Sequence, residues 1–176
     1  TITEPTALSL IINGNNPVCY QGLGSASVGV SGGTPGYAYS WNNGIASSIN
    51  NNLEAGNYNV TVIDANGCEA TESVDLIEPD SIEINISVND VLCNGGEGSV
   101  EVILPAGSGY SYNWSDGQTS RIATNLPAGD YSVTVSNAAG CSNISAITVT
   151  EPTEYTSSLV SNNALCYAGA GDATIT

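Results

Sequence analysis

Apolar and polar residues alternate along most of this sequence. Three runs carry an apolar or aromatic residue at every second position: Ala26, Val28 and Val30; Tyr37, Tyr39 and Trp41; Tyr58, Val60 and Val62. Side chains of a β-strand point to opposite faces in turn, so each run predicts a strand with one face on a core. No stretch keeps the period of an amphipathic helix. The pattern therefore predicts an all-β protein.

Clusters of Gly, Asn and Asp separate the apolar runs. Asn43-Gly44 and Asp116-Gly117 are dipeptides typical of tight turns, because these residue types tolerate positive φ angles. Between the clusters, the sequence predicts strands near residues 6–12, 24–30, 37–42, 46–50, 58–64 and 71–77, with equivalents one period further on.

That period is visible in several kinds of landmark. Glu-Pro dipeptides begin at Glu4, Glu78 and Glu151, so the steps are 78 − 4 = 74 and 151 − 78 = 73 residues. The same register relates two sets of cysteines, two tryptophans and two tyrosines: Cys19, Cys93 and Cys166; Cys68 and Cys141; Trp41 and Trp114; Tyr58 and Tyr131. Agreement among so many landmarks indicates tandem repeats.

The landmarks divide the chain into four segments. We expect residues 1–4 to end a preceding repeat, residues 5–78 and 79–151 to form two complete repeats, and residues 152–176 to begin a third. The first residues match the end of the second repeat, so we expect the chain to be a piece of a longer array.

Six or seven short strands in about 73 residues predict a small immunoglobulin-like β-sandwich for each repeat. Trp41 and Trp114 fall on the third strand and are predicted to be core residues. Tyr58 and Tyr131, near the start of the penultimate strand, are predicted to be largely buried tyrosine corners, whose hydroxyls bond to nearby backbone. Tyr37, Tyr39 and Trp41 could instead form a sugar-stacking platform, but their place among Val-rich strands favours a core role.

The net charge of the chain limits the classes of partner that it can bind. The chain has 17 acidic residues, one basic residue and a net charge of −16, which disfavours binding to nucleic acid and to anionic membranes. No apolar run is long enough to span a membrane. Acidic residues at a repeat junction could hold calcium, and Glu78 and Asp80 are the candidates. The next junction, Glu151-Pro152-Thr153, lacks the second acid, so a plain linker without a cofactor is favoured.

The residues for common catalysis are missing. The chain has no His and no Lys, so it offers neither an imidazole base nor an amine nucleophile. The absence of His and of a Cys-x-x-Cys motif also argues against zinc. We therefore expect no catalytic residue and no enzymatic activity.

Five cysteines in such small domains indicate disulfides and an extracellular location. If an even number of strand reversals separates the two cysteines of a repeat, they lie at the same end of the sandwich, and Cys19–Cys68 and Cys93–Cys141 form. If a seventh strand intervenes, Cys19 pairs with Cys141 between repeats. Only residues 43–53 connect the tryptophan strand to the tyrosine corner, which favours six strands and pairing within repeats. Cys166 is then left over.

Three strings together resemble the SprB-type repeat of Bacteroidota gliding-motility and cell-surface adhesins. They are Cys-x-x-Gly-x-Gly-Ser at 19–25, Gly-Gly-Thr-Pro-Gly-Tyr-Ala-Tyr-Ser-Trp-Asn-Asn-Gly at 32–44, and Leu-x-Ala-Gly-x-Tyr-x-Val-Thr-Val-x-x-Ala-x-Gly-Cys at 53–68. The second copy retains them, except that Pro105–Gly109 replaces the Gly-Gly-Thr-Pro-Gly turn. The resemblance implies export, by the type IX system, to the cell surface.

Three functions stay open, and the weakest of them is an accessory domain of an enzyme. In the first, the repeats form a disulfide-reinforced stalk of a long adhesin or extracellular filament, and their partners are neighbouring repeats of the same chain. In the second, the repeats themselves bind polysaccharide or solid surfaces. Near-identical landmarks with different loops favour the stalk, because a spacer needs only its core to be kept.

Overall fold

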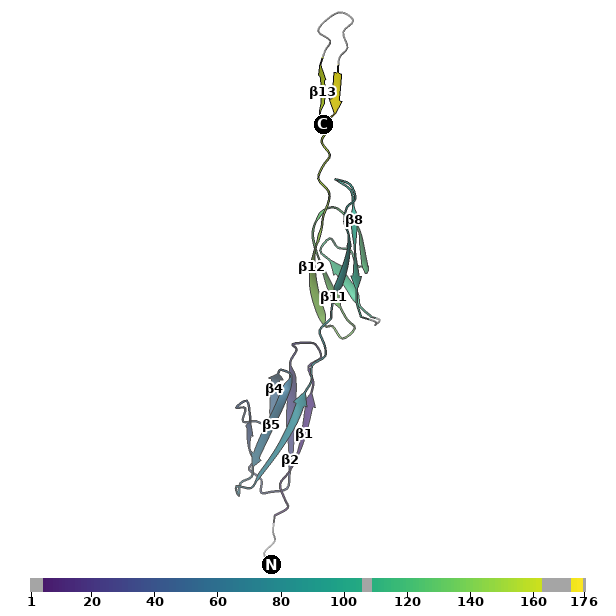
Figure 1. Ribbon diagram of the computed structural model, residues 1–176. Helices are drawn as coiled ribbons and strands as arrows, with labels where there is room; N and C mark the ends of the chain where they lie inside the picture. The colour runs from purple at the N-terminus through teal and green to yellow at the C-terminus, as the bar shows by residue number, and fades with distance from the viewer. Residues whose placement is uncertain (1–4, 106–108, 163–171, 176) are drawn as a thin grey trace, which may run out of the picture. The chain divides into compact units, whose positions relative to one another are not determined.

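The computed structural model describes residues 5–105, 109–162 and 172–175. Residues 1–4, assigned above to a preceding repeat, and Cys166 lie outside this range. All regular elements of the described residues are β-strands (Figure 1). The described part of the chain contains no helix long and apolar enough to cross a membrane.

The first repeat forms two three-stranded antiparallel sheets. Their orders are β1-β2-β4 and β3-β5-β6. This is the order in which immunoglobulin-like sandwiches divide their strands between two sheets, so the predicted fold class is confirmed. The strands are β1 (Ser9–Asn15), β2 (Gly24–Ser31), β3 (Ala38–Trp41), β4 (Ile49–Leu53), β5 (Gly56–Ile63) and β6 (Glu69–Leu76).

The second repeat has the same strand order, in sheets β7-β8-β10 and β9-β11-β12. Its strands are β7 (Asn85–Asn89), β8 (Gly98–Ile103), β9 (Ser111–Trp114), β10 (Ile122–Leu126), β11 (Gly129–Ser136) and β12 (Ser142–Val149). After it, β13 (Leu159–Asn162) and β14 (Asp172–Ile175) pair as an antiparallel ladder.

The chain divides into two compact units that do not coincide with the sequence repeats. The first contains residues 1–84, 104–112 and 134–144, and the second contains residues 85–103, 113–133 and 145–176. Two segments of the second repeat thus belong to the first unit. The predicted boundaries at residues 78 and 151 describe the sequence period, and β1–β6 and β7–β12 fall on either side of the first of them.

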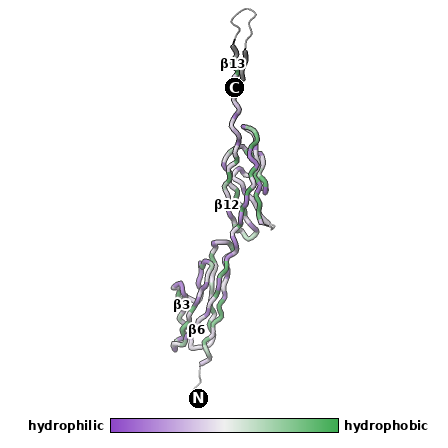
Figure 2. The backbone as a smooth tube through the Cα atoms, in the orientation of Figure 1, coloured by the Kyte–Doolittle hydropathy of each residue, from purple (hydrophilic) through white to green (hydrophobic). Residues whose placement is uncertain are grey.

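Each repeat buries the inward-facing residues of both of its sheets. In the first, Ala26, Val28, Trp41, Leu53, Val60, Val62 and Leu76 form the core. The second buries the residues one period on: Val100, Val102, Trp114, Leu126, Val133, Val135 and Val149. Figure 2 shows hydrophobic and hydrophilic residues interspersed along the backbone of both repeats. The predicted alternation is therefore the reason that the two sheets pack together.

Strands β3 and β4 run in the same direction, although they follow each other in the chain. β3 is antiparallel to β5 and β4 is antiparallel to β2. β2 and β5 run the same way, because both start at one end of the sandwich. Leu76 pairs with Gly56 at the start of β5, and its side chain lies against Gly24 at the start of β2. β3 and β4 have only four and five residues, so together they cross the sandwich once and change sheets on the way.

The connection between these strands also explains a boundary error. The sequence predicted a strand at 46–50, whereas β4 spans Ile49–Leu53. Residues 42–48 form the crossing between sheets, in which the N–H of Trp41 donates to the carbonyl of Ile45, and the N–H of Val28 donates to that of Ser48. A segment that changes sheets cannot keep the regular alternation of a strand.

Candidate functional site

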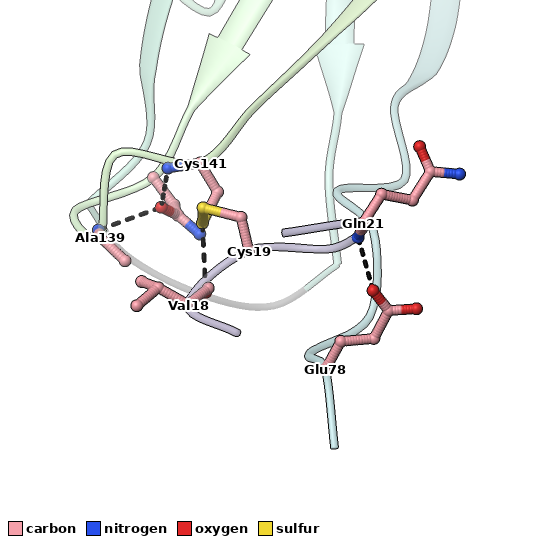
Figure 3. The surroundings of a disulfide bond; sticks show 7 residues. Val18, Cys19, Gln21, Glu78, Ala139 and Cys141 are labelled. Carbon is pink, nitrogen blue, oxygen red and sulfur yellow. Dashed lines mark hydrogen bonds between the residues drawn. A yellow bond between two sulfur atoms is a disulfide. The ribbon is translucent and has the colours of Figure 1, made fainter. Parts of the chain in front are cut away.

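The cysteines form the most distinctive chemistry of the chain. Cys19 is bonded to Cys141, with a Cα–Cα distance of 5.4 Å and a sequence separation of 122 (Figure 3). Cys68 and Cys93 are free and exposed. The favoured pairs Cys19–Cys68 and Cys93–Cys141 are thus wrong for this structure, which contains the alternative pair between repeats.

Strand direction gives the physical reason. Between Cys19 and Cys68 the chain crosses the sandwich three times, through β2, through β3 with β4, and through β5. An odd number of crossings puts the two cysteines at opposite ends. β2 alone has eight residues and spans about 25 Å, far beyond the roughly 7 Å Cα separation that a disulfide tolerates. The prediction failed because it counted β3 and β4 as two crossings.

Cys19 begins a tight turn whose backbone is hydrogen-bonded to the side chain of Glu78. The N–H of Gly22 donates to the carbonyl of Cys19 at 2.9 Å. Gln21 has a positive φ of 54°, and its N–H donates to Glu78 Oε2 at 2.5 Å. Figure 3 shows Glu78 reaching the turn beside the disulfide. The glutamate of the Glu-Pro landmark therefore has a structural role.

The second repeat builds the same turn at Cys93. The N–H of Gly96 donates to the carbonyl of Cys93 at 2.9 Å, and the N–H of Gly95 donates to Glu151 Oε2 at 2.7 Å. Gly95 has a positive φ of 74°, matching Gln21. This repetition explains why a Glu-Pro dipeptide follows the first cysteine at nearly the same spacing in both copies, 78 − 19 = 59 and 151 − 93 = 58 residues.

The calcium candidates Glu78 and Asp80 differ in their surroundings. Glu78 accepts the hydrogen bond from Gln21, whereas Asp80 is exposed. Among the described residues, no three or more Asp, Glu or Cys side chains gather in a group that could hold a metal ion. The favoured plain linker without a cofactor, and calcium at this junction as its alternative, both stay predictions.

Cys68 and Cys141 end matching hairpin tips. In the β5–β6 tip, the N–H of Asp64 donates to the carbonyl of Cys68 at 2.9 Å, and the N–H of Gly67 donates to the carbonyl of Asp64 at 3.0 Å. In the β11–β12 tip, Asn137, Gly140 and Cys141 form the same two bonds at 2.9 and 3.0 Å. The two glycines have φ angles of 85° and 84°.

One side-chain oxygen organises each tip. Asp64 Oδ1 accepts from the N–H groups of Asn66 and Cys68 at 2.9 and 2.8 Å. Asn137 Oδ1 accepts from those of Ala139 and Cys141, both at 3.0 Å. Sequence reasoning missed both residues. A signal was available, because an Asp or Asn three residues before a Gly-Cys pair is typical of a side-chain-capped turn.

Asp64 also binds a second loop. Its Oδ2 accepts from the N–H of Thr34 at 2.8 Å, and the side chain is only 5 % exposed. This bond from Thr34, followed by that from Cys68, favours the carboxylate and holds the pKa of Asp64 below its ordinary value of 3.8, against the opposing effect of burial. Gly33 permits the approach, because a Cβ there would lie 2.9 Å from Asp64 Oδ2.

The predicted aromatic core residues are anchored by hydrogen bonds. Trp41 and Trp114 are each 2 % exposed, and their indole N–H groups donate to the carbonyls of Ser47 and Ser120 at 2.8 and 2.9 Å. Tyr37 and Tyr39 pack against the core, as a core role requires.

Tyr58 and Tyr131 form the predicted corners. Their hydroxyls donate to the carbonyls of Glu54 and Pro127, both at 3.0 Å. However, both side chains are half-buried rather than largely buried. Each corner lies near the start of the central strand of its sheet, β5 or β11, at one end of the sandwich. There the hydroxyl binds backbone that is itself open to solvent.

Comparison with known families supports the motif-based resemblance. Residues 12–45 match the family model of the SprB repeat. The resemblance is thereby confirmed for a segment that runs from β1 through β3 and holds Cys19, the Gly-Gly-Thr-Pro-Gly turn and Trp41. No curated protein matches the chain.

Several solved structures have weak similarity to the chain. Murine CEACAM1b is 10 % identical, with a TM-score of 0.30, 82 % of this chain and all of that chain covered. The BSP domain of a biofilm-associated protein is 17 % identical, with a TM-score of 0.27, 82 % of this chain and 30 % of that chain covered. Domains 3 and 4 of rat CD4 are 13 % identical, with a TM-score of 0.27, 83 % of this chain and 87 % of that chain covered. The immunoglobulin-like assignment rests on strand order alone.

Proposed function

We propose that the chain is a structural segment of a long, secreted cell-surface adhesin or extracellular filament, in which the Cys19–Cys141 disulfide reinforces a stalk. Disulfides form and persist in oxidising compartments, which agrees with export to the cell surface. The SprB repeat match at residues 12–45 supports a role in adhesion or gliding. The partners of each repeat are then its neighbours in the same chain.

The position of the disulfide carries this proposal. The bond encloses the chain from Cys19 to Cys141, a separation of 122 residues that includes all strands from β2 to β11. Tension applied to the two ends of the chain passes through the disulfide and bypasses these strands. Only the strands outside the loop can then be pulled out. A segment that keeps its length under load suits a stalk.

Force spectroscopy on the whole chain, pulled from its ends, tests the proposal. The sequence separation of 122 between the two cysteines corresponds to about 400 Å of extended chain. We expect the fully unfolded oxidised chain to be shorter by this length than the Cys19→Ser/Cys141→Ser variant, because the disulfide prevents the enclosed segment from extending. Cys68→Ser/Cys93→Ser, which removes the two free thiols of the described residues, is the matched control and should behave as the parent. Equal extension of all three chains would contradict a stalk reinforced by this bond.

A groove favours the second function, binding of polysaccharide or solid surfaces. Tyr20, Asp80, Glu83 and Tyr110 line one open groove of the first compact unit, and Tyr20 is 49 % exposed. Aromatic rings can stack on sugars while carboxylates accept bonds from sugar hydroxyls.

Retention on immobilised polysaccharides and on glass tests this alternative. Binding by repeats predicts that Tyr20→Ala weakens retention, whereas Tyr155→Ala, at a residue 99 % exposed and outside the groove, leaves it unchanged. No retention of the parent chain on any of these surfaces would leave the stalk as the proposed function.

A further inference from the structure

Two exposed thiols of the chain lie in copies of the two loops that the disulfide joins. Cys19 and Cys93 are the first cysteines of their repeats, and Cys68 and Cys141 are the second ones. One member of each kind is bonded, Cys19 to Cys141. Of the other described cysteines, Cys93 is of the first kind and Cys68 is of the second, and both are free. The unpaired thiols are thus of complementary kinds.

The loop at Cys93 has the geometry of the bonded loop at Cys19. In both, a turn closes three residues after the cysteine at 2.9 Å, and a glutamate accepts the backbone N–H two residues after it. These bonds are present at Cys93 without a disulfide, so the loop does not depend on the bond for its form.

The tip at Cys68 likewise has the geometry of the bonded tip at Cys141. The closing backbone bonds have the same lengths in both tips, 2.9 and 3.0 Å. The N–H of each cysteine donates to a side-chain oxygen four residues earlier, at 2.8 Å for Cys68 and 3.0 Å for Cys141. The tip is therefore formed before a partner arrives, which lowers the conformational entropy lost on bonding.

We infer that Cys93 and Cys68 each form a further staple of the same kind, in which the first cysteine of one repeat bonds to the second cysteine of another repeat, as Cys19 bonds to Cys141. The partner is another repeat that presents the complementary cysteine. In the experiment below, a second copy of the chain supplies that repeat. This inference rests on the disulfide and its replicated loops, and it does not depend on the stalk function.

The bond requires an oxidant, and a small-molecule disulfide such as oxidised glutathione supplies it. The thiolate of one cysteine attacks the glutathione disulfide, forms a mixed disulfide and releases one glutathione thiol. The second protein thiolate then attacks the protein sulfur of the mixed disulfide and releases the other glutathione thiol. Two protein thiols become one disulfide, and the two electrons and two protons end on two glutathione molecules.

Mixing two single-thiol chains tests the inference. Cys166 would be a further first cysteine, so both chains carry Cys166→Ser. One also carries Cys68→Ser, leaving Cys93, and the other carries Cys93→Ser, leaving Cys68. The chains are labelled at different masses, mixed in equal amounts in a glutathione redox buffer, and separated on a non-reducing gel. Mass spectrometry of the dimer bands identifies the bonded cysteines.

Random oxidation of two exposed thiols gives about two heterodimers for each homodimer. We expect the ratio of the Cys93–Cys68 heterodimer to each homodimer to be about tenfold higher than this random ratio. A tenfold higher ratio corresponds to a difference of about 1.4 kcal/mol. Cys19–Cys141 should remain intact in all bands, which controls for disulfide exchange. A random ratio, dominant homodimers, or mixed glutathione disulfides without dimers would each overturn the inference.

Discussion

The β5–β6 tip of the first repeat and the β11–β12 tip of the second have matching backbone hydrogen bonds, but their cysteines differ in bonding state. Each places a cysteine after a glycine of positive φ and caps its N–H with a side-chain oxygen. One cysteine is free, and the other is bonded to Cys19. The comparison teaches that local sequence forms the tip, whereas the bond depends on which loop of another repeat reaches it.

The two tips also differ in what else their capping residue does. Asp64 binds Thr34 in the Gly-Gly-Thr-Pro-Gly turn, in addition to its own tip. In the second repeat that turn is replaced by Pro105–Gly109, and the capping residue is Asn137. The carboxylate and the turn that uses its second oxygen occur together in one copy and are both missing from the other. The charge at this position therefore serves contact between loops, because an amide oxygen suffices for the tip.

The largest expected effect comes from removing the bond that distinguishes the tips. A closed loop with a 122-residue separation contributes up to about 5 kcal/mol on the chain-entropy model. Cys19→Ser/Cys141→Ser should lower the free energy of unfolding toward that extent, measured by urea denaturation without reductant. Cys68→Ser/Cys93→Ser should change it little. Equal losses in the two variants would show that the bond does not set the difference.

The buried tryptophans test whether the two cores are equivalent. Trp41→Ala and Trp114→Ala each remove a side chain that is 2 % exposed and should each cost about 3–5 kcal/mol of unfolding free energy. Denaturation followed by the remaining tryptophan reports on the unmutated repeat, and by circular dichroism on the whole chain. A cost below about 1 kcal/mol at one site would mean that the second core differs from the first.

The tyrosine corners should give a smaller, matched effect. Tyr58→Phe and Tyr131→Phe each remove one hydroxyl bond to backbone, both at 3.0 Å. Because both side chains are half-buried, we expect a cost of about 0.5–1 kcal/mol each in urea denaturation. A clear difference between the two costs would show that Glu54 and Pro127 position their carbonyls differently.

Acid should destabilise the two tips differently. The pKa of Asp64 in the folded chain lies below 3.8, so its contribution to stability is present above pH 3.8 and is lost as pH falls through the lower folded value. Asp64→Asn should therefore reduce the fall in melting temperature on acidification below pH 3.8. Asn137→Asp is the reciprocal change. It should not add a matching fall in melting temperature on acidification, because the second tip has no counterpart of the Thr34 contact. An unchanged acid profile for Asp64→Asn would rule out this role.

Much of this protein was readable from its sequence. The spacing of Glu-Pro, Cys, Trp and Tyr predicted two copies of one unit, and the alternation at Ala26, Val28, Val60 and Val62 predicted residues that are buried. These features are local or periodic, so each follows from side-chain direction in a strand. The corner bonds of Tyr58 and Tyr131 follow similarly, because the hydroxyl binds backbone only four residues away.

The pairing of the cysteines was decided only in three dimensions. It depends on whether β3 and β4 cross the sandwich once or twice, and the sequence between them is compatible with both. The partners of Trp41 and Val28 in residues 45–48 make the chain change sheets midway, which leaves an odd number of crossings between Cys19 and Cys68. Hydrophobic pattern sets which face of a strand is buried, but it carries no information on strand direction. For that reason, the sequence determined the sandwich, and the tertiary structure determined which cysteines meet.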